Sequence, residues 1–326
     1  MLAAIPGARA SGHASGAQDA IRAIVTKSAN DVAIVLARGG CRVTVVEPTA
    51  DKRAALPTHV LAGLSELGLA HRADRVQDAA SLQDVRWTDV RLVIECIPEK
   101  LDIKQALFKQ LVQLAPAQAV LTSNSSSFPI SAIAQELPTQ ERMLGLHFFM
   151  PAHLVPLVEV VLGPHSDEAL AQGLCAFMRG CGNVPVLVRK DKPGFLANRL
   201  QHALSREAFA MIDEGVATPE DVDAAVRFGF GFRYLAAGPV MQRDHAGIDV
   251  HCAAAATMYP SLSNTAEPSR ALRERVQAGR IGMKAGAGFY DWTPESRQAE
   301  RDRYDRLLRH GLQLLASELP PIDKSF

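Results

Sequence analysis

Three consecutive segments near the start of this chain constrain its fold more than any other part. A β-rich run, IRAIVT, is followed by VAIVLAR, which suits a helix, and then by CRVTVVE, which is rich in β-branched residues. Ser28 or Asn30 can cap the helix, which we expect to begin near Ala29, and Gly39 and Gly40 can end it. A strand, a helix and a strand in this order are typical of the first unit of a doubly wound, nucleotide-binding sheet.

Further apolar runs continue this pattern, and we interpret each of them as a buried strand. These expected strands are RLVIECIP, AVLTS, Met143 to Phe149, Val155 to Leu162, and VPVLVRK. Helices are expected from Glu99 through Leu114 and over residues 166–181, whereas residues 52–86 are expected to be mostly helical and connecting.

The motif DKPGF marks a domain boundary near residue 190, because Pro and Gly interrupt regular structure. Beyond it the apolar residues follow helical spacing, and Thr218 can cap a helix that begins with Pro219. The predicted fold class is α/β: an N-terminal Rossmann-like doubly wound sheet followed by an all-helical C-terminal domain. The predicted parts are an irregular N-terminal segment, a Rossmann-like dinucleotide-binding domain, and a helical substrate and dimerisation domain, at residues 1–20, 21–190 and 191–326.

Composition excludes several classes of partner. Lys plus Arg and Asp plus Glu number 35 each, so there is no basic surplus to follow a phosphate backbone, and we expect no nucleic acid partner. No apolar run approaches the length of a membrane span, and the N-terminus lacks the pattern of a secretory signal. The five cysteines form no CxxC pair, which favours reduced thiols and a cytoplasmic location.

A serine cluster and two apolar runs between residues 121 and 161 carry the candidate chemistry. Ser126, His147 and Glu159 have the residue types of a hydroxyl donor, a proton acceptor and an orienting carboxylate. If the two runs are neighbouring strands, His147 and Glu159 can meet near one edge of a sheet. His147 and His153 are six residues apart without an acidic partner pattern, so no metal site is predicted. The other histidines considered are expected at the surface or in hinges: His153, His165 and His245.

Several ordered motifs resemble the 3-hydroxyacyl-CoA dehydrogenase family over roughly residues 20 to 292. They are SNSSSF, GLHFFMP, PLVEVV, DKPGFLANRL and GMKAGAGFYDW. The resemblance implies NAD-dependent, reversible oxidation of a 3-hydroxyacyl-CoA to the 3-ketoacyl-CoA, as in fatty acid metabolism. In that reaction His147 acts as the base, Glu159 orients it, and Ser126 and Asn198 hydrogen-bond the reacting oxygens. The resemblance also implies a homodimer through the helical domain.

The cofactor residues come partly from position and partly from the resemblance. Glu47 ends the second expected strand, where an acidic residue binds the adenosine ribose, and this favours NAD over NADP. The resemblance places five other residues beside the cofactor: Glu99, Lys104, Ser126, Met150 and Lys284. Met150 stands where the family has Asn.

The first turn lacks the glycines of a dinucleotide fingerprint. Ile24, Thr26 and Ala29 occupy the three usual glycine positions. A side chain at the second position keeps the backbone from approaching the pyrophosphate closely, so we expect weak NAD binding. The Thr26 hydroxyl and the N-terminus of the following helix replace part of the lost contact. On this pattern, glycine at both Ile24 and Thr26 strengthens binding.

Two alternatives to the acyl-CoA dehydrogenase remain open on the sequence. One is a paralogue that keeps the fold and binds acyl-CoA but has lost NAD. The other is a dehydrogenase of a free 3-hydroxy acid, such as carnitine or gulonate.

Overall fold

The computed structural model describes residues 21–26 and 30–322. The predicted irregular segment 1–20, and the positions Ser28 and Ala29, lie outside the described residues. The chain forms two compact units: one runs to Asn198 and takes in the segment from Ser317 onward, and the other is Arg199–Ala316. Within the described part of the chain, every helix is too short or too polar for a bilayer span.

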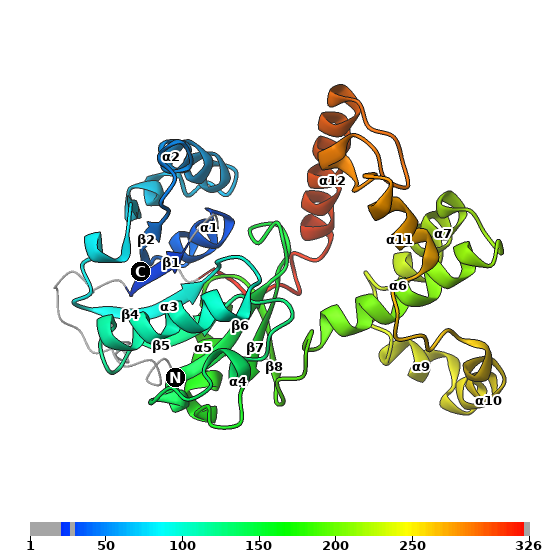
Figure 1. The fold of residues 1–326 in the computed structure, drawn as a ribbon, viewed down its shortest axis with the longest axis horizontal. Helices are drawn as coiled ribbons and strands as arrows, with labels where there is room; N and C mark the ends of the chain where they lie inside the picture. Colours follow the sequence, from blue (N-terminus) through cyan, green and yellow to red (C-terminus); the bar gives the residue numbers. More distant parts are fainter. Residues whose placement is uncertain (1–20, 27–29, 323–326) are drawn as a thin grey trace. The chain divides into compact units, whose positions relative to one another are not determined.

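The first unit is built on an eight-stranded sheet in the order β3-β2-β1-β4-β5-β6-β7-β8 (Figure 1). All neighbouring strands are parallel except β6 and β7, which are antiparallel. Reversal of strand order on either side of β1 is the signature of a doubly wound sheet, so the predicted α/β fold class is confirmed. The strands are β1 (Arg22–Thr26), β2 (Arg42–Val46), β3 (Val76–Ala79), β4 (Val90–Glu95), β5 (Val120–Ser123), β6 (Met143–Phe148), β7 (Leu157–Leu162) and β8 (Val184–Val188).

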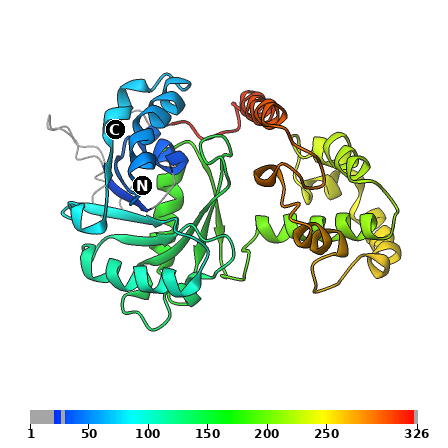
Figure 2. The ribbon, with the colours of Figure 1, turned by 45° about the horizontal axis from the view of Figure 1, so that its top comes forward.

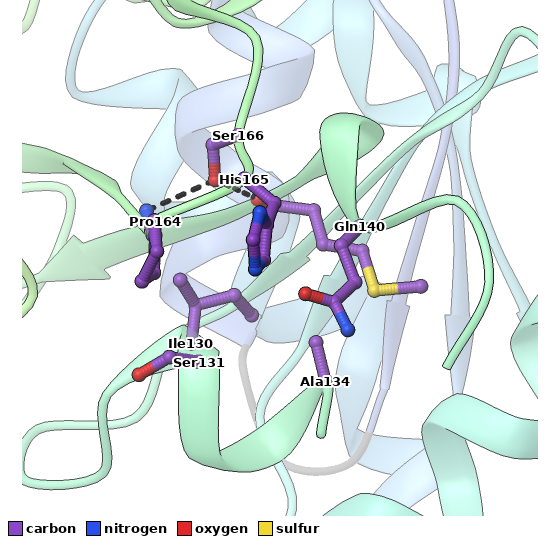
Figure 3. A pocket seen from close by; sticks show the side chains of 9 residues that line it. Ile130, Ser131, Ala134, Gln140, Pro164, His165 and Ser166 are labelled. Carbon is purple, nitrogen blue, oxygen red and sulfur yellow. Dashed lines mark hydrogen bonds between the residues drawn. The ribbon is translucent and has the colours of Figure 1, made fainter. Parts of the chain in front are cut away.

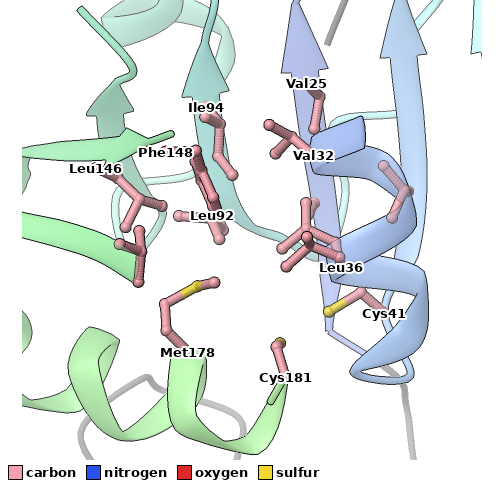
Figure 4. Packing of buried hydrophobic residues seen from close by; sticks show 14 of the residues in the cluster. Val25, Val32, Leu36, Cys41, Leu92, Ile94, Leu146, Phe148, Met178 and Cys181 are labelled. Atoms are coloured by element: carbon pink, nitrogen blue, oxygen red, sulfur yellow. The ribbon is translucent and has the colours of Figure 1, made fainter. Parts of the chain in front are cut away.

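Helices cover both faces of this sheet (Figure 2). Strand side chains alternate between the faces, so Val25 packs in one core and Ile24 in the other. The Val25 core includes apolar residues of α1 and α5 (Figure 4) and of α2, and the Ile24 core includes residues of α3 and α4. The bounds are α1 (Asn30–Arg38), α2 (Ala50–Ser65), α3 (Leu101–Leu114), α4 (Ile130–Ile133) and α5 (Glu168–Gly180).

One strand was not predicted from the sequence. Residues 52–86 contain α2 and short 3-10 turns, as expected, but also β3. Its sequence is VQDA, and its two middle residues are exposed at the edge of the sheet. A strand this short and polar carries no apolar run, so hydrophobic periodicity does not detect it.

The second unit is helical, and its sequence signals are mostly those of helix ends. Thr218 caps α7 through a capping box with Asp221, and Pro219 is the first helical residue, as expected. Among the described residues of this unit, Ala271 is the one apolar side chain that is buried. The helices are α6 (Ala197–Asp213), α7 (Pro219–Ala224), α8 (Gly231–Arg233), α9 (Met241–Ala246), α10 (Ile248–Met258), α11 (Arg270–Gln277) and α12 (Pro294–Leu314).

Candidate active site

His147 and Glu159 form a hydrogen-bonded pair across two strands. They lie directly opposite each other in the antiparallel ladder of β6 and β7. Opposite residues of such a ladder project to the same face, which brings the His147 Nδ1 to 2.8 Å from Glu159 Oε2. Both side chains are buried. The register of one strand pair therefore assembles the two groups.

The second carboxylate oxygen of Glu159 is held by the backbone. Glu159 Oε1 accepts hydrogen bonds from the N–H groups of Leu196 (3.0 Å) and Ala197 (2.8 Å), at the start of α6. Gly194 and Phe195, in the DKPGF motif, have φ values of +75° and +50°, and this left-handed turn directs both N–H groups toward the carboxylate. The sequence marked this motif as a boundary and missed its role in fixing Glu159.

Glu159 is ionised, which decides the tautomer of His147. Burial raises the pKa of Glu159, but the hydrogen bonds from His147 and Ala197 outweigh burial, and the pKa is lowered. An ionised carboxylate only accepts hydrogen bonds, so Nδ1 of His147 is assigned the proton. Nε2 is then the nitrogen whose lone pair can accept a proton.

Ser126 contacts Nε2 of His147, and Asn198 contacts Ser126. Ser126 Oγ lies 3.1 Å from His147 Nε2, and the Asn198 amide donates to the Ser126 carbonyl at 3.2 Å. Asn124 accepts a hydrogen bond from the Phe148 N–H at 2.8 Å and so ties this serine loop to β6. The structure thus brings together all four residues predicted as catalytic, and adds Asn124 as a support that the sequence did not indicate.

A second polar cluster is buried between β4, α3 and β5. Lys104 Nζ lies 2.8 Å from Glu95 Oε1 and 3.2 Å from Glu99 Oε2. The Lys104 and Glu95 side chains are fully buried, whereas Glu99 is partly exposed. Ser123 Oγ donates to the other oxygen of Glu95 at 2.5 Å. Glu95 was not predicted as a site residue from the sequence. Its position at the end of an apolar strand is the feature that could have identified it.

Glu99 is the part of this cluster that reaches the surface. Its Oε1 accepts hydrogen bonds from the Ser125 and Ser127 hydroxyls and from the Ser127 N–H. Burial raises its pKa, but these serines and Lys104 lower it to about 2. Glu99 therefore carries a negative charge beside the loop that contains Ser126, and the buried Lys104 ammonium pairs with that charge.

The remaining predicted cofactor residues lie in separate places. Glu47 is buried just after β2, and its Oε1 accepts from the Thr49 N–H at 2.9 Å. Thr26 is buried, and its Oγ1 accepts from the Cys96 N–H at 3.0 Å, so this oxygen is bonded to the end of β4. Met150 is 54% exposed. Lys284 is exposed on a 3-10 turn of the second unit.

Ile24 is not part of the first turn, and its side chain is not replaceable. It lies inside β1, pairs with Thr44 and Val93, and is fully buried. Removing such a side chain leaves a cavity, at a cost of about 2–5 kcal/mol. The double substitution to glycine that the pattern suggested is therefore wrong as a way to improve binding, because it would first destabilise the sheet.

A shallow surface pocket lies at the other end of β6 (Figure 3). Ser131, Gln140 and His165 are among its lining residues, and Ser166 Oγ donates to the Met143 carbonyl at its base. Met143 begins β6 and His147 stands near its end, about 13 Å along the strand. The pocket therefore belongs to the opposite end of the sheet from the His147 cluster.

Two family models match this chain in succession. The model described as "3-hydroxyacyl-CoA dehydrogenase, NAD binding domain" matches residues 29–192, and the one described as "3-hydroxyacyl-CoA dehydrogenase, C-terminal domain" matches residues 194–292. The chain belongs to the 3-hydroxyacyl-CoA dehydrogenase family. It is an NAD-dependent oxidoreductase of that family.

Relatives in this family differ in substrate. The chain is 33% identical to a 5-formyl-3-hydroxy-2-methylpyridine 4-carboxylate 5-dehydrogenase of Mesorhizobium japonicum, over 82% of this chain and 89% of the relative. It is 41% identical to the 3-hydroxyadipyl-CoA dehydrogenase of Escherichia coli, over 63% of this chain and 42% of the relative. It is 34% identical to the L-carnitine dehydrogenase of Streptomyces griseus, over 82% of each.

The fold similarity extends over both units of the family architecture. A crystal structure of a 5-formyl-3-hydroxy-2-methylpyridine 4-carboxylic acid 5-dehydrogenase, described as an NAD⁺-dependent dismutase, has a TM-score of 0.84 to this chain at 29% identity. The match covers 90% of this chain and 98% of the other.

The first unit fits NAD at two of the three places where a dinucleotide is held. The reversed strand order provides the crevice at the carboxyl ends of the strands, where the chemistry-bearing residues of β4, β5 and β6 gather. Glu47 stands after β2, where the adenosine ribose binds. The third place, the turn after β1, has no glycine, because Lys27, Ser28 and Ala29 follow Thr26 in the sequence.

Proposed function

We propose that this 3-hydroxyacyl-CoA dehydrogenase family member oxidises a 3-hydroxyacyl thioester reversibly to the 3-keto form, with His147 as the base. The observation that carries the proposal is the position of the His147 ring between Glu159 and Ser126. Nδ1 lies 2.8 Å from Glu159 Oε2, and Nε2 lies 3.1 Å from Ser126 Oγ. A histidine held in this way is suited to take the proton of a substrate hydroxyl.

The residues of this chain then have distinct tasks. His147 Nε2 removes the hydroxyl proton as the C3–H bond breaks, and Glu159 stabilises the imidazolium that forms. Ser126 Oγ and the Asn198 amide hydrogen-bond the reacting oxygens. Bound NAD supplies the acceptor for the hydride, while the protein supplies orientation and proton transfer. In the reverse direction the imidazolium returns its proton to the 3-keto oxygen.

For the cofactor, we propose Glu47 at the adenosine ribose and Glu99, Met150 and Ser126 near the nicotinamide. Lys104 supports Glu99 in this proposal, because its ammonium is buried against Glu95 and Glu99. Thr26 and Lys284 stay predictions, as do the cytoplasmic location, the place in fatty acid metabolism and the domain boundary at residue 190.

A second candidate is the oxidation of a free hydroxy acid that carries no CoA. The observation that favours it is the length of the similarity to two relatives. The relatives from Mesorhizobium japonicum and Streptomyces griseus match 82% of this chain, and their names contain no CoA. Their similarity to this chain is not confined to the sheet domain.

A comparison of substrates at equal concentration separates the two candidates. The protein is mixed with NADH and either acetoacetyl-CoA, free acetoacetate or 3-dehydrocarnitine, and NADH absorbance is followed. Under the main proposal acetoacetyl-CoA is reduced with the highest kcat/KM. Faster turnover of either free acid would favour the second candidate.

A further inference from the structure

Arg53 is six residues beyond Glu47 in the sequence, yet its guanidinium contacts the end of β2. It lies on α2, and its Nη1 donates to the carbonyls of Glu47 and Pro48, at 2.8 Å each. Its Nε lies 3.4 Å from Asp78 Oδ2 on β3. The Arg53 side chain is 23% exposed and that of Asp78 is 44% exposed. A partly exposed ion pair therefore lies beside Glu47, the residue proposed for the adenosine ribose.

The strand register places these groups at one edge of the sheet. β2 and β3 are parallel, with Val45 opposite Asp78, and the Glu47 N–H donates to the Ala79 carbonyl at 3.0 Å. Ligands of open α/β sheets bind beyond the carboxyl ends of the strands. Arg53 and Asp78 thus lie at the edge of the sheet where a dinucleotide binds.

The two nicotinamide dinucleotides differ at this place. NADP carries a phosphate on the 2′-oxygen of the adenosine ribose, where NAD has a hydroxyl. A carboxylate after the second strand hydrogen-bonds that hydroxyl, whereas a nearby arginine accommodates the phosphate. A guanidinium pairs with phosphate through charge-assisted hydrogen bonds. This chain therefore has a residue of each type at the end of β2: Glu47, suited to NAD, and Arg53, suited to NADP.

We propose that Asp78 is a specificity-determining residue, which keeps the cofactor site selective for NAD by pairing with Arg53. The pair compensates the positive charge that would otherwise attract a 2′-phosphate. Two carboxylates and one guanidinium leave the group of Glu47, Arg53 and Asp78 with a net negative charge, which opposes a phosphate dianion. The inference rests on the proposed position of Glu47 at the adenosine ribose.

The pair can be opened without loss of the fold. A partly exposed ion pair contributes little to stability, so Asp78→Asn should remain folded. The hydrogen bonds from Arg53 Nη1 to the two backbone carbonyls do not involve Asp78, and they keep the guanidinium at the end of β2. In this variant the charge of Arg53 is no longer compensated by Asp78.

The test compares NADPH with NADH, which differ only in the 2′-phosphate, by calorimetry on the full chain. Wild-type protein should bind NADH more tightly than NADPH. Asp78→Asn should bind NADPH about tenfold more tightly than wild type does, with NADH affinity unchanged within about twofold. Asp74→Asn is the matched control, because Asp74 is exposed in the 3-10 turn that precedes β3. This control should leave the affinities for both cofactors unchanged.

A double variant assigns the gain to the guanidinium. Arg53→Gln combined with Asp78→Asn should bind NADPH no more tightly than wild type does. If NADH binds but Asp78→Asn shows no gain for NADPH, or if the gain persists in the double variant, the inference is overturned and the proposed function stands. No NADH binding by wild-type protein at millimolar concentration would overturn the proposed function and the inference with it.

Discussion

At the scale of single residues, the account depends on the environment of His147. Its two ring nitrogens have different partners: Nδ1 contacts the Glu159 carboxylate, and Nε2 contacts the Ser126 hydroxyl. Aromatic rings of Phe149 and Phe195 lie 4.6 Å and 5.7 Å from the imidazole, centroid to centroid, and limit the directions from which a ligand approaches.

The first prediction replaces this base. His147→Gln is close in shape and keeps a polar contact to Glu159, so the fold should survive. It cannot take up a proton, and kcat should fall about 10²–10⁴-fold. His165→Gln, an exposed histidine by the pocket at the other end of the sheet, serves as the matched control and should keep full activity. Wild-type turnover by a folded His147→Gln protein would remove His147 from the mechanism.

A second prediction concerns Met150, which is exposed and stands where the motif resemblance implies Asn. A thioether is a weak acceptor and no donor, so a hydrogen bond to the nicotinamide or substrate is missing. Met150→Asn should tighten NADH binding, measured by the quenching of protein fluorescence. Exposed Met241, at 54% on the second unit, offers a control substitution to Asn. An NADH affinity that stays the same or weakens in the Met150 variant would count against a cofactor contact here.

At the scale of elements, β4, α3 and β5 meet at a junction where charged side chains are buried. Glu95 ends β4, Glu99 lies in the segment between β4 and α3, and Lys104 on α3 pairs with both carboxylates. Removing one partner of such a buried pair leaves a charge without compensation. The junction therefore fixes the position of the loop that carries Ser126.

This junction yields a prediction on acid stability. The pKa of Glu99 is lowered from 4.5 to about 2, so its contribution to stability is full above 4.5 and is lost as pH falls toward 2. Wild-type protein should lose more thermal stability over that window than Glu99→Gln does. Glu136→Gln, on an exposed turn, is the control. If the melting temperatures of wild type and Glu99→Gln fall by the same amount across this pH window, the contacts between Glu99 and the serines do not hold in solution.

The elements also show what sequence patterns can predict. β1, β2 and β4 to β8 carry apolar runs and were predicted, whereas polar β3 was not. The pairing of His147 with Glu159 was expected only as a consequence of neighbouring strands, since periodicity does not determine which residues lie opposite each other.

At the scale of the whole molecule, the helical unit exposes much apolar surface. Phe228 and Val240 are 73% and 79% exposed, and further large apolar side chains on α6, α9 and α10 are also exposed. Apolar surface of this extent on a unit with so little buried core is typical of an interface. We propose that a second copy of the chain covers it.

The corresponding prediction is a dimer of the 35.1 kDa chain in sedimentation velocity at micromolar concentration. Phe228→Asp combined with Ile248→Asp places two charges in the proposed interface and should shift the protein toward monomer. Leu61→Asp, on an exposed position of α2, should leave the dimer intact. A wild-type protein that sediments as a monomer would refute the homodimer.

The most direct test of the central claim is the absorbance of NADH after mixing with the protein and acetoacetyl-CoA. The account predicts oxidation of NADH that depends on acetoacetyl-CoA and is lost in His147→Gln. Millimolar NADH allows for weak binding at a first turn without glycine. A protein that binds acetoacetyl-CoA by calorimetry yet oxidises no NADH at that concentration would contradict the account and point to a paralogue that keeps the fold without the reaction.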